Sequence, residues 1–205
     1  MQMTDMQIND RSNLANSVSG VLVVDKPVGM TSHDVVQQVR AGTHIRRAGH
    51  TGTLDPRASG VLVVLIGPAV RLSEYVSTSD KRYQAVLRFG ITTSTYDTEG
   101  EITSRTPVDI SYEELEETLN TFVGEFEQTP PIYSAIKVNG RKAYDYARDG
   151  ETVDLEPRMI TVHSIELLDW DPPEAVIDIH CSSGTYIRSL ASDLGQKLGC
   201  GATLV

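Results

Sequence analysis

The chain has 205 residues, of which 40% are apolar and 22% charged, a composition typical of one folded domain with an ordinary core. No apolar run reaches the roughly 18 residues that a membrane-spanning helix needs, so the sequence excludes a protein that crosses a membrane with helices. The formal net charge of −10, taken by itself, argues against a nucleic-acid partner.

The N-terminal segment is polar, rich in Asn, Ser and Asp, and lacks the apolar stretch of a signal peptide. We therefore expect residues 1–19 to form a disordered tail and residues 20–205 to form the folded domain. The two cysteines, Cys181 and Cys200, have neither a C-x-x-C arrangement nor the spacing of a zinc site. They are predicted to be reduced thiols in a cytoplasmic protein.

The first part of the domain alternates apolar runs with short helical patterns. Buried strands are predicted for Gly20–Asp25 and for Val61–Ile66, because both runs are rich in β-branched residues. Between them, Ser32 is expected to cap a short helix with valines on one side. Pro68 suits the first turn of a further helix that reaches Tyr75.

Strands dominate the rest of the chain. Alternating apolar and polar residues predict a half-buried strand over Tyr83–Phe89, and a capping box at Ser111–Glu114 starts a helix that Gly124 is expected to end. A last helix is predicted from Ile187, with Gly199 closing it. Three more strands are predicted, the first entering a hairpin turn at Asn139-Gly140: Tyr133–Val138, Met159–Leu168 and Ala175–Cys181. Together these elements predict an α+β fold with a mixed, largely antiparallel central sheet flanked by helices.

Charge is distributed unevenly along the chain. The segment Asp109–Glu127 holds seven acids and neither Lys nor Arg, a pattern typical of a solvated helix face. Basic residues gather elsewhere, at Arg40, Arg46, Arg47, Arg57, Lys81, Arg82, Arg141 and Lys142. A polyanion can therefore dock on a basic face while the acidic helix points away from it.

The loop Ala48–Pro56 places a single carboxylate, Asp55, among glycines, a histidine and a proline. Gly49 and Gly52 permit bent backbone conformations, and Pro56 pushes Asp55 into an extended one. A carboxylate nucleophile aimed at an anionic polymer would have this setting, with arginines preceding it. The alternative interpretation is an Asp-Pro pair that only starts a turn, which is the commoner use of that pair.

Two other positions are informative. Arg188 falls in the first turn of the last predicted helix, where the helix dipole disfavours a cation by about 0.3–1 kcal/mol. A nearby carboxylate or phosphate would compensate, and a side chain that extends into water is the alternative. Tyr83 follows Lys81-Arg82 at the start of a strand. Its ring suits stacking on a base or proton transfer, unless it is an ordinary core tyrosine.

The motifs, taken in order, resemble those of the TruB-type tRNA pseudouridine synthases. Six segments carry the resemblance: Gly20–Ser32, Arg47–Pro56, Ser79–Tyr83, Thr95–Gly100, Pro130–Lys137 and Gly184–Arg188. The resemblance implies a pseudouridine synthase catalytic domain over residues 20–205. It also implies conversion of the uridine at position 55, in the T-arm of tRNA, without a cofactor or a metal. The catalytic subunits of guide-RNA particles share the Asp loop, whereas the uninterrupted Thr95–Gly100 segment is more similar to the stand-alone bacterial enzymes.

The resemblance also implies a role for each matching residue. Asp55 matches the catalytic aspartate, Tyr83 the tyrosine that stacks on the target base, and Arg188 the arginine that pairs with the catalytic carboxylate. The substrate-binding set is His50, Tyr186, Asp97, Arg47, Lys81, Arg82 and Lys26. Within that set, the histidine is implied to fill the stack left by the flipped nucleotide, and the lysine to support the Asp loop. A monomer that binds the T-arm stem-loop of tRNA is implied.

Two departures from the family pattern leave alternatives open. Members of the family normally continue into the rest of the catalytic sheet and a small RNA-binding PUA domain, whereas this sequence ends at Val205. Thr203 stands where many members have histidine. One alternative is therefore a tRNA-binding folding helper that has lost catalysis. A hydrolase with an Asp nucleophile is another, although it lacks a second carboxylate of defined role and a metal cluster.

Overall fold

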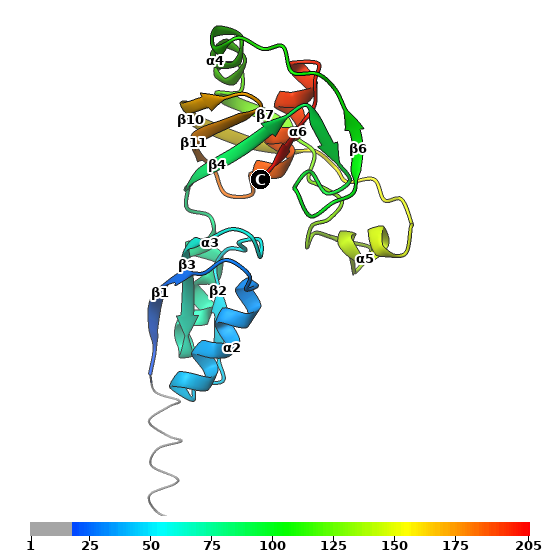
Figure 1. The fold of residues 1–205 in the computed structure, drawn as a ribbon. Coiled ribbons are helices and arrows are strands. Elements are labelled where there is room, and N and C mark those ends of the chain that lie inside the picture. The colour runs from blue at the N-terminus through cyan, green and yellow to red at the C-terminus, as the bar shows by residue number, and fades with distance from the viewer. Residues whose placement is uncertain (1–17) are drawn as a thin grey trace, which may run out of the picture. The chain divides into compact units, whose positions relative to one another are not determined.

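The computed structural model describes residues 18–205, which form two compact units (Figure 1). Unit 1 ends at Ser79 and unit 2 begins at Asp80. The expected tail over residues 1–19 lies almost entirely outside the described residues. Within residues 18–205, no helix is both long and apolar enough to cross a membrane.

Unit 1 is a small antiparallel sheet packed on one helix. Its strands run in the order β1-β3-β2 among the described residues, and the apolar side of α2 packs on them through Val35 and Val36. The elements in chain order are β1 (Gly20–Lys26), α2 (Ser32–Thr43), β2 (Ala48–His50), β3 (Gly60–Ile66), the 3₁₀ helix η1 (Gly67–Leu72) and α3 (Ser73–Ser77). The sheet thereby carries the two loops that precede α2 and follow β2.

Three expectations for unit 1 need correction. β1 is not a buried strand, because it lies at the sheet edge and exposes 56% of Val21 and 70% of Val23. The cap of α2 is Thr31 rather than Ser32, since the Thr31 side chain accepts a hydrogen bond from the Asp34 amide and the Asp34 side chain accepts one in return. The helix expected from Pro68 is divided into η1 and the short α3.

Unit 2 is built on an antiparallel sheet of order β12-β4-β11-β10-β7 among the described residues. Its strands are β4 (Lys81–Phe89), β7 (Gly124–Gln128), β10 (Arg158–Asp171), β11 (Glu174–Cys181) and β12 (Ala202–Leu204). The helices α4 (Tyr112–Asn120) and α6 (Ile187–Lys197) bury Leu115, Leu119, Leu190 and Leu194 in the same core as the strands. The predicted α+β class is confirmed.

Smaller elements complete unit 2 and revise several predictions. These elements are the hairpins β5 (Ile91–Thr93) with β6 (Ile102–Arg105) and β8 (Lys137–Val138) with β9 (Arg141–Lys142), and the helix α5 (Ala143–Arg148). The strand predicted from Tyr133 is thus reduced to the two residues of β8, although Asn139 and Gly140 do form the turn, with φ of 52° and 83°.

The acidic segment is only partly helical. The capping box is confirmed, because the side chain of Ser111 accepts from the Glu114 amide and that of Glu114 accepts from the Ser111 amide. Gly124 does not end α4, which stops at Asn120; with φ of 120° it begins β7, a strand that the sequence analysis missed. The last acids of the segment therefore lie on a strand.

The C-terminal residues add a strand beyond the last predicted helix. β12 pairs with β4 at the edge of the sheet, and α6 crosses β12 closely at Gly195. Thr203 is buried there, with its hydroxyl 3.1 Å from that of Thr93. A methyl group on Gly195 would overlap the backbone nitrogen of Ala202, so this approach requires glycine.

Replacing Gly195 by Ala is therefore expected to destabilise the protein by about 3 kcal/mol, because backbone atoms cannot move aside as a flexible side chain does. The measurement is urea unfolding followed by circular dichroism. Gly42→Ala in α2 is the matched control, since a methyl group there meets nothing within 4 Å. The control should be neutral or stabilise by up to about 1 kcal/mol, and equal losses in the two variants would contradict the packing described.

Candidate active site

The Asp55 loop is held by hydrogen bonds on both sides of the aspartate. On one side, the Ser32 hydroxyl donates to the Leu54 carbonyl at 3.1 Å and accepts from the Leu54 amide at 2.9 Å. On the other, the Gly29 amide donates to the Pro56 carbonyl at 2.8 Å. Asp55 is itself half-buried. The backbone that carries this carboxylate is therefore fixed, as a catalytic group requires.

Lys26 joins the end of β1 to the same loop. Its side chain is fully buried, and Nζ donates to the carbonyls of Met30 at 2.7 Å, Pro27 at 3.0 Å and Pro56 at 3.4 Å. Burial lowers the pKa of Lys26, while the negative charge of Asp55 acts to raise it. A lysine in this position thus supplies both hydrogen bonds to the loop and a cation within electrostatic reach of Asp55.

His50, at the end of β2, is half-buried. Burial lowers the pKa of His50, helped by nearby His33 and opposed by the backbone of Gly52. The neutral form is therefore favoured near pH 7, which leaves a flat ring without charge. The arginines before this strand differ from one another: Arg40 donates to the Ala48 carbonyl at 2.7 Å, whereas Arg47 is exposed.

In unit 2, Arg188 lies in the first turn of α6 and is only 8% exposed. Its Nη1 is 3.5 Å from Oδ2 of Asp97 and donates to the Thr95 carbonyl at 3.3 Å, and its Nη2 donates to the Tyr133 carbonyl at 3.1 Å. The Asp97 carboxylate is fixed in turn by the Thr95 hydroxyl and by the Glu99 amide. Asp97 is thus an anionic partner for Arg188, whose positive charge is unfavourable at the N-terminus of a helix.

Gln128 positions the start of α6 and is a residue that the sequence analysis missed. It lies buried at the end of β7, where its side-chain oxygen accepts from the Tyr186 amide at 2.8 Å and its amide nitrogen donates to the Tyr186 carbonyl at 3.1 Å. The Ser189 hydroxyl donates to the Thr129 carbonyl at 2.8 Å. No local pattern marks Gln128, because β7 itself is too short to be recognised from periodicity.

The start of β4 distributes its residues over the two faces of the sheet. Tyr83, opposite Ile179, is half-buried against the core, and Lys81, two residues earlier, lies on the same face. Arg82 lies on the opposite face, where its Nε is 2.7 Å from Oδ1 of Asp178. The two neighbouring cations therefore cannot serve one phosphate-binding surface in the same way.

Comparison with known proteins gives this arrangement a context. The family model described as TruB family pseudouridylate synthase (N terminal domain) matches residues 40–187. The chain belongs to the TruB family. The relationship inferred from the ordered motifs is thereby confirmed.

Curated relatives within the TruB family agree. The tRNA pseudouridine synthase B of Pseudomonas aeruginosa (strain UCBPP-PA14) is 47% identical over 189 residues, which cover 92% of this chain and 62% of that protein. The protein of the same name from Escherichia coli (strain K12) is 47% identical over 188 residues, covering 92% and 60%. The chain therefore spans about 60% of the length of these relatives.

Solved structures support the fold. In a Cbf5-Nop10-Gar1 complex, one chain superimposes with a TM-score of 0.71 at 28% identity, covering 94% of this chain and 48% of that chain. In an H/ACA RNP bound to a substrate RNA containing 2'-deoxyuridine, the TM-score is 0.68 at 26% identity, covering 95% and 47%. This TruB-family chain is thus similar in fold to a chain of a protein complex and to a chain of an RNP bound to a substrate RNA.

The described units divide the predicted TruB-family site residues into two groups. Unit 1 contains Asp55, His50, Arg47 and Lys26, and unit 2 contains Tyr83, Lys81, Arg82, Asp97, Tyr186 and Arg188. The contact between Arg188 and Asp97 brings two members of the second group together. The expected pairing of Arg188 with Asp55 joins residues of different units and stays a prediction.

Replacing Lys26 by Met is expected to destabilise the chain by about 2 kcal/mol or more, because buried carbonyls lose their donor. Amide hydrogen exchange should quicken at Gly29 and Ala58, whose N–H groups bond to Pro56 and Asp55. Lys197→Met is the control, since this exposed lysine makes a surface hydrogen bond to Thr121 and its loss should change stability by less than about 0.5 kcal/mol. Unchanged exchange in the loop would contradict the role given to Lys26.

Proposed function

We propose that this protein converts uridine to pseudouridine at position 55 of tRNA, in the T-arm, as a cofactor-free isomerase. Membership of the TruB family supports this activity, as does the name of its relatives, tRNA pseudouridine synthase B. The observation that carries the proposal is the half-buried carboxylate of Asp55 on a loop whose backbone is held by hydrogen bonds on both sides of it. Residues 20–205 are proposed to act as one monomeric, cytoplasmic catalytic domain.

The proposed reaction rearranges one nucleotide without adding or removing a group. The target nucleotide is flipped out of the RNA, and Asp55, acting as a carboxylate, attacks the ribose or promotes a glycal, so that the bond between uracil and sugar breaks. The freed uracil turns and rejoins the sugar through C5, and the C5 proton leaves. Both routes need an ionised Asp55 in a fixed position, which the hydrogen bonds at Leu54 and Pro56 support.

The base-binding roles are assigned to residues with suitable burial. Tyr83 presents a half-buried ring on β4, and we propose that it stacks on the flipped uracil and that its hydroxyl takes part in removing the C5 proton. His50 is proposed to fill the space that the nucleotide leaves; a ring kept neutral by burial suits stacking between bases. Lys26 is proposed to support the catalytic loop.

Arg188 is proposed to pair with Asp55 in the assembled site and to hold the base-binding network through Asp97. Its contacts with the Thr95 and Tyr133 carbonyls support a positioning role, because they join two loops to the start of α6. Tyr186, at the same helix start, is proposed to pack beside the pair of Arg188 and Asp55.

The proposed RNA contacts follow from the face on which each cation lies. Lys81 shares its face of β4 with Tyr83, which supports our proposal that it binds a phosphate close to the stacked base. Arg47 is exposed and is proposed to contact the RNA from unit 1. Arg82 also belongs to the proposed RNA-binding set, but its ion pair with Asp178 on the other face makes it the weaker contact.

Replacing Asp55 by Asn should reduce turnover by at least about 1,000-fold, because the amide keeps the shape and loses the nucleophile. Release of tritium from T-arm RNA labelled at uridine C5 measures this loss directly. Binding of tRNA should persist. Asp25→Asn, at an exposed carboxylate of β1, is the control and should retain full turnover.

Three outcomes of this experiment separate the alternatives. Turnover of the Asp55 variant within tenfold of the wild type would refute the assigned role. Wild-type protein that binds T-arm RNA but releases no tritium would favour the folding helper. An Asp-nucleophile hydrolase would instead liberate free uracil, which chromatography of the reaction detects.

Replacing Lys81 by Ala should weaken tRNA binding for all sequences and reduce the slope of log affinity against log salt by about 1. Arg82→Ala is the matched control, a neighbouring cation on the opposite face, and should change the slope by less than half as much. Filter binding over a series of salt concentrations measures both. If Arg82 proves to be the stronger contact, the RNA lies on the other face of the sheet.

A further inference from the structure

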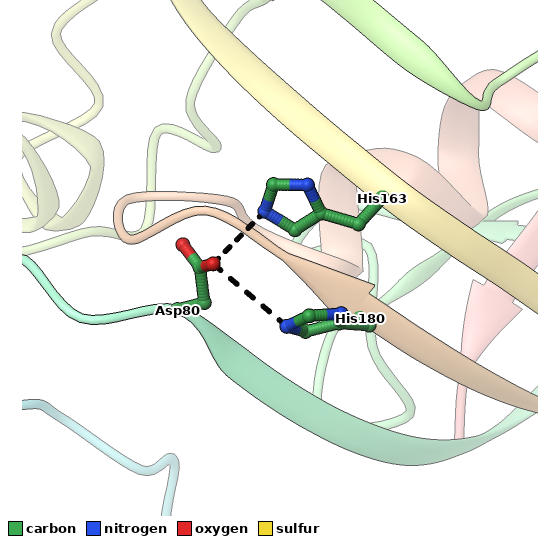
Figure 2. Close-up of side chains that lie close together, drawn as sticks. All are labelled: Asp80, His163 and His180. Atoms are coloured by element: carbon green, nitrogen blue, oxygen red, sulfur yellow. Dashed lines mark ion pairs between the residues drawn. The ribbon is translucent and has the colours of Figure 1, made fainter.

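Asp80, His163 and His180 form a cluster on the face of the unit 2 sheet opposite Tyr83. Figure 2 shows both imidazole rings beside the Asp80 carboxylate. Oδ2 of Asp80 is 3.1 Å from Nε2 of His163 and 3.8 Å from Nε2 of His180, and the ring centroids are 4.6 Å apart. One ligand atom from each residue lies within 4.8 Å of the others.

The three residues come from separate strands. Asp80 directly precedes β4, His180 lies on β11 and His163 on β10. Because β11 lies between the other two strands, β4 and β10 are about 9.6 Å apart, twice the spacing of neighbouring strands. His163 therefore reaches across β11 to approach Asp80.

A β-bulge accompanies the position of His163. The register of β10 on β11 pairs Val162 with Cys181 and Ser164 with His180, so that His163 is the extra residue. A bulge bends its strand and re-aims the side chain of the inserted residue, and bulges are over-represented beside functional sites. His163 and Ser164 are both exposed on this face. This agrees with a bulge, in which two residues of β10 lie opposite the single residue His180 of β11.

We propose that Asp80, His163 and His180 bind a divalent transition-metal ion, with Zn²⁺ as the best match. Imidazole nitrogens suit zinc, nickel and copper, whereas magnesium and calcium prefer oxygen ligands. Two nitrogens and one carboxylate oxygen form a three-ligand zinc site whose remaining position takes water. With metal–ligand bonds of about 2.0–2.2 Å, tetrahedral ligand atoms are about 3.3–3.6 Å apart, so the side chains need only small rotations.

The surroundings of the cluster agree with a bound cation. Each of the three side chains is between a third and a half exposed, which leaves access for the ion and for water. Arg82 lies directly opposite His180 in the ladder and would repel a metal, but its guanidinium is paired with Asp178 at 2.7 Å. Arg82 therefore has Asp178 as its carboxylate partner, while the Asp80 carboxylate faces the two histidines.

Metal binding would join three strands at the residue that begins unit 2. The cluster lies on the other face of β4 from Tyr83 and Lys81, so the ion has no part in the isomerisation proposed above. Its expected effect is on stability, because an ion that binds only the folded chain raises the unfolding temperature by mass action.

The test is Zn²⁺ binding to the full chain after treatment with a chelator, measured by isothermal titration calorimetry and thermal unfolding. One ion per chain is expected, with a rise in unfolding temperature; Mg²⁺ should not compete. The variants His163→Ala, His180→Ala and Asp80→Asn should each bind Zn²⁺ at least ~10-fold more weakly. Loss of a residue that only hydrogen-bonds a metal ligand already costs about 10-fold or more in metal affinity. His33→Ala, at an exposed histidine of α2, is the control and should bind as the wild type does.

A second measurement needs no variant. Addition of Zn²⁺ should shift the imidazole NMR signals of His163 and His180 and leave those of His33 and His44 unchanged. Absence of Zn²⁺ uptake, uptake that survives His163→Ala, or shifts spread over all the histidines would overturn the proposal. In any of these cases the cluster is only a surface ion pair.

Discussion

The buried ammonium of Lys26 is the interaction on which the candidate active site depends. It lies at the end of β1 and donates to carbonyls of the loop before α2 and of the loop that carries Asp55. A cation without contact with water is costly unless its hydrogen bonds are satisfied, so the two loops must close around it. The same closure sets the backbone on either side of Asp55. The hydrogen bonds that stabilise unit 1 at Lys26 therefore also set the position of the backbone that carries the Asp55 carboxylate.

In unit 2, a buried cation also bonds to loop carbonyls, at the start of α6. Arg188 is nearly buried, and two of its contacts are backbone carbonyls, those of Thr95 and Tyr133, rather than carboxylates. A cation that bonds to carbonyls fixes the path of loops, since a carbonyl cannot move without its backbone. Asp97 supplies the charge that such a buried guanidinium needs. In both units a buried cation gives a loop its shape, and the acid beside it gains a fixed position.

Periodicity predicts the long elements of this fold and misses the short ones. β4 and β11 alternate over nine and eight residues, whereas β2 and β12 have three each, too few for a period to appear. Gly124 was wrongly expected to end a helix, because a glycine with positive φ occurs both at helix ends and, as here, at the start of a strand. Thr31 and Ser32 are equally suitable N-caps by residue type. Thr31 is the cap because Asp34, three residues after it, completes a capping box with it. The sequence marks Arg188 as needing an anion, but only tertiary structure brings Asp97 to it.

The fold also shows how the net charge of −10 is compatible with the polyanion binding proposed above. Most of the excess acid lies on α4 and β7, and β7 is the edge of the sheet farthest from β12. Three strand spacings separate β7 from β4, which amounts to about 14 Å. The Debye length at physiological ionic strength is about 8 Å, so an RNA phosphate beside Lys81 is largely screened from Glu125 and Glu127. Net charge is a property of the whole chain, whereas binding depends on the charge within one Debye length of the contact.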